Sequence, residues 1–77
     1  MDINSFIENF ADQFDDLDAS TLSGTTVFKD LEEWSSMMAL AVMAMVNEEY
    51  DVELKGDDIR KSNTIEDLFN TVKSKKA

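Results

Sequence analysis

The chain has 77 residues, which suffices for one domain with a small hydrophobic core and no more. Seven basic and seventeen acidic side chains give a formal net charge of −10, so we expect no nucleic-acid partner and favour a protein partner with a basic surface. Neither cysteine nor histidine is present, which excludes disulfide bonds and argues against serine- or cysteine-type catalysis within the chain.

Proline is absent and there are only two glycines, a composition that favours helices over a turn-rich β-fold. No segment approaches the length of a membrane span, so we expect no membrane insertion. Residues 1–4 lack the basic start and apolar run of a secretory signal, and we therefore expect a cytoplasmic protein.

The first predicted helix is marked by apolar residues three and four positions apart, namely Ile3, Phe6, Ile7, Phe10 and Phe14. This spacing places three aromatic rings on one face and predicts a helix packed against the core. Ser5 and Glu8 have the spacing of a capping box that would begin this helix, although the apolar pattern starts slightly earlier.

A long connection is predicted from about residue 15 to residue 35, where the helical periodicity fails and serine, threonine and glycine supply turn chemistry. Connections of this length are uncommon in compact domains unless they are functional or are held by their own side chains. The apolar side chains available to hold it are Leu22, Val27, Phe28 and Leu31.

The second helix is predicted from Ser36 to Tyr50, with Ser35 as its N-cap. All ten residues from Met37 to Val46 are apolar, and a helix in so small a domain cannot be buried on every side. A turn of about 100° per residue separates two arcs of this helix. The arc assigned to the interior consists of Ala39, Val42, Met43, Val46 and Tyr50, and the second arc consists of Met37, Leu40, Ala41, Ala44 and Glu48.

The second arc begins beside Ser36 and leaves Met37 and Leu40 exposed if the first arc faces inward. An exposed apolar patch usually indicates contact with a partner, and coverage by neighbouring loops is the alternative. The flexible methionines of this helix suit either a cavity that repacks around varied guests or simple gap filling.

A short third helix is predicted within residues 56–61, anchored by Ile59. The fourth helix begins at Thr64, with Asp67 as its capping partner. Its apolar face is formed by Ile65, Leu68, Phe69 and Val72. We expect the basic tail from about residue 74 to residue 77 to fray.

Three segments, residues 28–31, 36–37 and 48–54, resemble the acyl carrier protein family over its most diagnostic stretch. Their sequences are Phe28-Lys29-Asp30-Leu31, Ser36-Met37 and Glu48-Glu49-Tyr50-Asp51-Val52-Glu53-Leu54. The resemblance extends from about Ile3 to Val72. It implies one all-α domain over residues 1–77, a small four-helix bundle with three main helices, a short third helix and a long loop between the first two.

In this family a serine at the start of the second helix carries 4′-phosphopantetheine, usually within the tripeptide Asp-Ser-Leu. Here Ser35 replaces the aspartate and Met37 replaces the leucine. The glycine that follows the loop leucine is missing, and residues 32–34 bring one residue more than usual before the serine. Ser36 is the preferred attachment residue because its spacing to Tyr50 matches the family, and Ser35 is the alternative.

By this resemblance the chain is a carrier and not an enzyme. It would carry acyl intermediates as thioesters on the arm at Ser36 and present them to enzymes of fatty acid or related acyl or secondary metabolite biosynthesis. The implied partners are a phosphopantetheinyl transferase and acyl-transfer, condensing or acyl-activating enzymes with basic and apolar docking patches. They would contact the second arc, and the chain itself would be a monomer.

The acyl group would enter a cavity lined by Phe6, Phe28, Val42, Met43, Val46, Leu54, Ile59 and Phe69. The rival interpretation is an unmodified acidic module that binds a protein through the apolar face of the second helix. We expect no metal site, because placing Gly56 at the glycine position of an EF-hand puts Ser62 where a bidentate glutamate is required.

Overall fold

The computed structural model describes residues 2–76. Within this range the chain forms four α-helices and no strand, which confirms the predicted all-α fold. The helices are α1 (Ile3–Ala11), α2 (Ser36–Tyr50), α3 (Gly56–Lys61) and α4 (Ile65–Lys76). Two single 3₁₀ turns, η1 (Ala19–Thr21) and η2 (Phe28–Asp30), lie in the long connection between α1 and α2.

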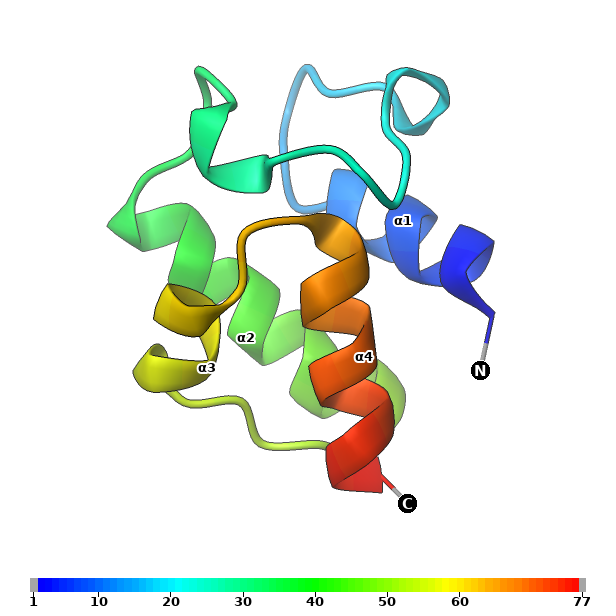
Figure 1. Ribbon diagram of the computed structural model, residues 1–77. Helices are drawn as coiled ribbons and strands as arrows, with labels where there is room; N and C mark the ends of the chain where they lie inside the picture. The colour runs from blue at the N-terminus through cyan, green and yellow to red at the C-terminus, as the bar shows by residue number, and fades with distance from the viewer. Residues whose placement is uncertain (1, 77) are drawn as a thin grey trace.

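The three longer helices enclose the core, and α1 contacts both α2 and α4. In Figure 1 the connection from α1 passes over the top of the molecule, and α3 lies to one side, where it packs against α4. The largest fully buried side chains come from α1, η2, α2 and α4, and they are Phe6, Phe10, Phe28, Val42, Val46, Ile65, Leu68 and Val72. The periodic apolar residues therefore meet in one shared core.

The start of α1 differs from the predicted capping box of Ser5 and Glu8, and that prediction is wrong. The N-cap is Asp2, whose carboxylate accepts a hydrogen bond from the Asn4 amide at 3.3 Å. The Ser5 hydroxyl donates to the same carboxylate at 3.3 Å. Asp2 immediately precedes the first apolar residue and is among the best N-cap residues, so the helix begins one turn earlier.

Aromatic packing fixes the second half of the connection. Phe28 is fully buried, and its ring lies 4.9 Å from the ring of Trp34 and 6.0 Å from that of Phe10, measured between centroids. Trp34 also stacks almost parallel to Phe10, with an angle of 8° between the rings. The predicted role of Phe28 in holding the connection is thereby confirmed, and Trp34 joins it.

The other three residues expected to hold the connection behave differently from one another. Leu22 and Leu31 are half-buried and pack against the core. Val27, in contrast, is 40% exposed, so the expectation that its side chain holds the loop is wrong. Its contribution comes from the backbone, which forms an isolated antiparallel bridge with Thr64 and leaves the side chain outside.

Backbone carbonyls of the connection also satisfy the start of α4. The Thr26 carbonyl accepts a hydrogen bond from the Ile65 amide at 3.0 Å, and the Gly24 carbonyl accepts one from the Glu66 amide at 2.9 Å. A Cβ atom on Gly24 would lie 3.2 Å from Cδ1 of Ile3, so a glycine allows the loop to approach this closely. The loop thus supplies acceptors that the first turn of a helix lacks.

The predicted cap of α4 is present. The Thr64 hydroxyl accepts a hydrogen bond from the Asp67 amide at 3.1 Å, and the Asp67 carboxylate accepts one from the Thr64 amide at 3.1 Å. Two amides are satisfied reciprocally, which is the arrangement of a capping box.

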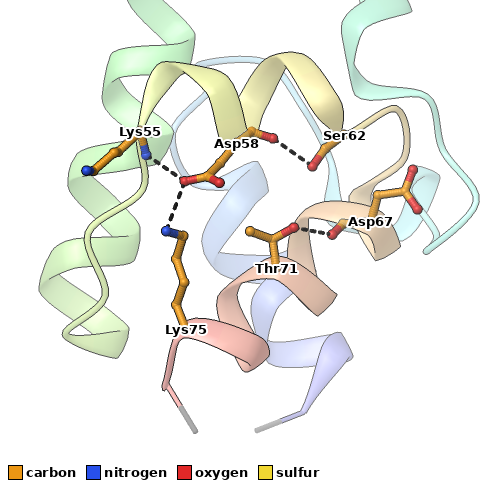
Figure 2. A network of polar contacts seen from close by, with 6 residues as sticks. All are labelled: Lys55, Asp58, Ser62, Asp67, Thr71 and Lys75. Carbon is orange, nitrogen blue, oxygen red and sulfur yellow. Dashed lines mark hydrogen bonds and ion pairs between the residues drawn. The ribbon is translucent and has the colours of Figure 1, made fainter.

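Two lysines of the last turn of α4 reach other parts of the fold. Lys75 forms an ion pair of 3.3 Å with Asp58 of α3, which Figure 2 shows together with the bond from the Lys55 amide to the same carboxylate. Lys76 donates a hydrogen bond of 2.8 Å to the carbonyl of Tyr50. The helix continues to Lys76, where we expected fraying from about residue 74, and Ala77 lies outside the described residues.

Candidate functional site

The helix α2 begins and ends at the predicted residues, and Ser35 is its N-cap. The backbone of Ser35 is extended, with φ −157° and ψ 174°. Its hydroxyl oxygen accepts a hydrogen bond from the Met38 amide at 3.3 Å, and its carbonyl accepts one from the Ala39 amide at 3.0 Å. The hydroxyl of Ser35 is therefore occupied in holding the start of the helix.

Ser36 is the first residue of α2 and is exposed. None of the hydrogen bonds found within residues 2–76 involves its hydroxyl, so this oxygen has no structural task like that of Ser35 there. The neighbouring Trp34 does not cover it, because the indole ring is half-buried against Phe10, Phe14 and Phe28.

The start of α2 suits a phosphodiester. The amides of Ser36 and Met37 precede the first intrahelical bond and have no acceptor within residues 2–76, so they are available to an anion. The dipole of a 15-residue helix adds partial positive charge at this end. The residues present therefore fit a phosphate ester on the Ser36 oxygen.

The second arc of α2 lies at the surface, as the helical turn predicts. Met37 is 79% exposed and Leu40 is 65% exposed, although both side chains are large and apolar. Ala44 and Glu48 are also exposed, and Ala41 is half-buried. An exposed apolar strip thus begins beside Ser36 and ends in an acidic residue.

The inward arc of α2 is broader than predicted. Val42 and Val46 are fully buried, while Ala39, Met43 and Tyr50 are half-buried. Met45, which we did not place in the interior, is only 4% exposed. Its position three residues after Val42 was the available signal, but an all-apolar helix has no polar residues to mark the limit of its buried face.

The eight residues predicted to line an acyl cavity meet in one core. Seven of them are buried, and Met43 is half-buried and packs against them. Two hollows at the surface are lined by residues of α1 and of the connection that follows it, and none of the eight contributes to either. Entry of an acyl chain among these side chains thus stays a prediction.

Two further features concern metals and membranes. Within residues 2–76, no three acidic side chains are grouped so that they could hold a metal ion. In the same range, every helix is too short or too polar to cross a lipid bilayer.

Comparison with known proteins adds one match. The sequence model of the family described as "Phosphopantetheine attachment site" matches residues 5–72. No curated protein and no solved structure matches the chain. The matched range includes most of α1, all of α2 and α3 and most of α4, and with them both serines at the start of α2.

Proposed function

Because the chain belongs to the phosphopantetheine attachment site family, whose members carry covalently bound 4′-phosphopantetheine, we propose that it is an acyl carrier protein with the arm on Ser36. The proposal covers one carrier domain over residues 1–77, acting as a cytoplasmic monomer without catalytic activity of its own. The observation that carries the assignment to Ser36 is its exposed, unbonded hydroxyl at the first turn of α2.

The two adjacent serines differ in what their hydroxyls do. Ser35 uses its oxygen to accept the Met38 amide, so modification there would disturb a helix cap. The oxygen of Ser36 has no such task, and the first-turn amides beside it can hold the phosphate in place. When bound, the arm supplies the terminal thiol that a chain without cysteine lacks.

The outer arc of α2 would receive the partner enzymes. Met37 and Leu40 provide an apolar centre next to the arm, Ala41 and Ala44 keep the surface flat, and Glu48 adds a negative charge. We propose that a phosphopantetheinyl transferase and the acyl-transfer, condensing or acyl-activating enzymes dock here through basic and apolar patches. Acyl intermediates of fatty acid or related acyl or secondary metabolite biosynthesis are the proposed cargo.

An acyl chain would be sheltered among the eight core residues between the helices. Each methylene removed from water would contribute about 0.8 kcal/mol, so longer chains would favour the interior more strongly. Met43 supports this part of the proposal because it is half-buried at the edge of that core and its unbranched side chain can change rotamer.

The proposal is tested by loading the purified chain with coenzyme A and a phosphopantetheinyl transferase. We expect the intact mass to rise by one phosphopantetheine in the wild type and to stay unchanged in Ser36→Ala. The Ser35→Ala variant should still be loaded, and its free energy of unfolding should fall by about 1 kcal/mol through loss of the cap.

A reversed pattern, with loading lost only in Ser35→Ala, would move the attachment residue to Ser35. Circular dichroism of both variants shows that a failure to load is not a failure to fold. If the wild-type mass never rises with an active transferase, the carrier proposal fails and the unmodified interaction module takes its place.

A further inference from the structure

Two adjoining hollows run along α1, at residues to which the proposed carrier function gives no role. They have volumes of about 540 Å³ and about 440 Å³, and they share Glu8 and Ala19 in their linings. The rest of the first lining comes from the end of α1 and the residues after it, and the rest of the second comes from the start of α1 and from η1. We call the two together the α1 groove.

The floor of the α1 groove is apolar. Ile7 and Ala11 lie in it with 7% and 4% of their surface exposed. Leu17, Ala19 and Leu22 also line it, and all three are half-buried and pack against the core. The floor is therefore made of apolar side chains anchored in the core, and its accessible part comes mainly from Leu17, Ala19 and Leu22.

The walls of the α1 groove are acidic and have no cationic partner. Glu8, Asp12, Asp16 and Asp18 line it, and all four are exposed. Neither of the ion pairs found within residues 2–76 involves them. The sequence has no lysine or arginine before Lys29, so the segment that forms the groove contains no basic side chain of its own.

Within the wall, Asp18 is fixed in position. Its carboxylate accepts a hydrogen bond from the Ser20 amide at 2.9 Å, which also holds the start of η1. The carboxylates are spread along the rim and do not converge on one point that could hold a metal ion within residues 2–76. An extended row of charges beside an apolar floor is complementary to a chain with the opposite pattern.

We propose that the α1 groove binds a cationic amphipathic segment of a partner protein, with lysine or arginine side chains against the acidic walls and an apolar stripe on the floor. In Figure 1 α1 and η1 lie on the other side of the molecule from the start of α2, to which the later part of the connection leads. Occupation of the groove therefore leaves Ser36 and the outer arc of α2 accessible. The partner would hold the carrier while another enzyme acts on the arm.

The test uses a fluorescent helical peptide of leucine and lysine as the probe. We expect binding by fluorescence anisotropy and changes in the amide resonances of Ile7, Ala11 and Ala19. Neutralising two wall residues in the double variant Glu8→Gln/Asp12→Asn should raise the Kd about fivefold or more. The control Glu49→Gln/Glu53→Gln changes the net charge equally, at two exposed residues outside both the groove and the outer arc of α2, and should change the Kd by less than about twofold.

Three outcomes would overturn the proposal. One is an equal loss of affinity in the two double variants, which would mean attraction by net charge alone. Another is equal affinity for a peptide of the same charge without leucine, which would remove the role of the apolar floor. The third is a footprint confined to α2. The same measurements on Ser36→Ala, which we expect to bind normally, separate this proposal from the carrier function.

Discussion

Ser35 and Ser36 have chemically identical side chains, but the backbone places their hydroxyl groups in different surroundings. The extended conformation of Ser35 turns its oxygen toward the Met38 amide, 3.3 Å away. Ser36 is already helical, and its side chain is exposed. One step along the chain thus separates a hydroxyl that caps the helix from one that is exposed and makes no hydrogen bond within residues 2–76.

A residue-scale prediction concerns Asp51, which ends α2 in the left-handed conformation with φ 55°. Its negative charge lies at the negative end of the helix dipole, and the last turn of α2 contains no basic residue. Asp51→Asn removes the charge while keeping a residue that tolerates this conformation. We expect the free energy of unfolding to rise by about 0.3–1 kcal/mol, measured by thermal unfolding at low ionic strength.

The matched control is Asp57→Asn, which removes an equal charge from the first turn of α3, where a negative charge is favourable. This variant should show no gain in stability. Equal gains in both variants would mean that the lower net charge, and not the helix end, is responsible.

At the scale of the elements, aspartate carboxylates accept hydrogen bonds from backbone amides at the starts of η1, α3 and α4. Hydrogen bonds from backbone amides lower the pKa of the Asp18, Asp58 and Asp67 carboxyls below the ordinary value of 3.8. The largest contribution to the pKa shift of Asp18 comes from the Ser20 amide. For Asp58 it comes from the Lys55 amide, and for Asp67 from the Thr64 amide. A second amide, that of Asn63, further lowers the pKa of Asp67. These carboxylates therefore hold η1, α3 and α4 more strongly when they are ionised than when they are protonated.

The element-scale prediction is a loss of stability in acid. A carboxyl whose pKa is lower in the folded state contributes stability above the ordinary value of 3.8, and this stability is lost as the pH falls through the folded-state pKa. We therefore expect Asp67→Asn to have a lower Tm than the wild type at neutral pH. The difference should shrink below pH 3.8, measured by thermal unfolding across the acid range.

The comparison variant is Asp15→Asn, because no hydrogen bond found within residues 2–76 involves the Asp15 carboxylate. A wild-type advantage over Asp67→Asn that stays constant down to the lowest pH would contradict the prediction.

At the scale of the whole molecule, negative charge is only partly compensated. The formal net charge is −10, and two ion pairs form within residues 2–76, Arg60 with Asp57 and Lys75 with Asp58. Six of the seven basic residues follow residue 54, so the whole of the negative excess lies in residues 1–54. Repulsion among like charges weakens the compact state and favours basic partners.

The whole-molecule prediction is that added sodium chloride stabilises the fold at neutral pH. Salt screens the repulsion between exposed carboxylates, and there are few ion pairs for it to weaken. We expect the Tm to rise with salt at pH 7 and to change much less near the pI of about 4.1, where the net charge is small. A Tm that falls with salt at pH 7 would show that attractive pairs dominate.

Short-range sequence rules were sufficient to predict most of the helix ends and their caps. The bounds of α2, the cap of Ser35 and the capping box of Thr64 and Asp67 follow from residues within one helical turn, and the structure agrees with each. The error at the start of α1 was also local, since Asp2 competed with Ser5 for the same role. The order and number of the four α-helices agree with the prediction, but the turns η1 and η2 were not predicted, and α1 ends at Ala11, before Phe14, which was expected on its apolar face.

Contacts between residues far apart in the sequence determine the features of the structure that the sequence did not predict. The sequence does not indicate that the backbone of Val27 would pair with Thr64, or that Trp34 would stack on Phe10, because these partners lie far apart along the chain. Met45 was missed for the same reason. An all-apolar helix is compatible with several buried faces, and the free energy of packing against neighbouring elements selects one of them.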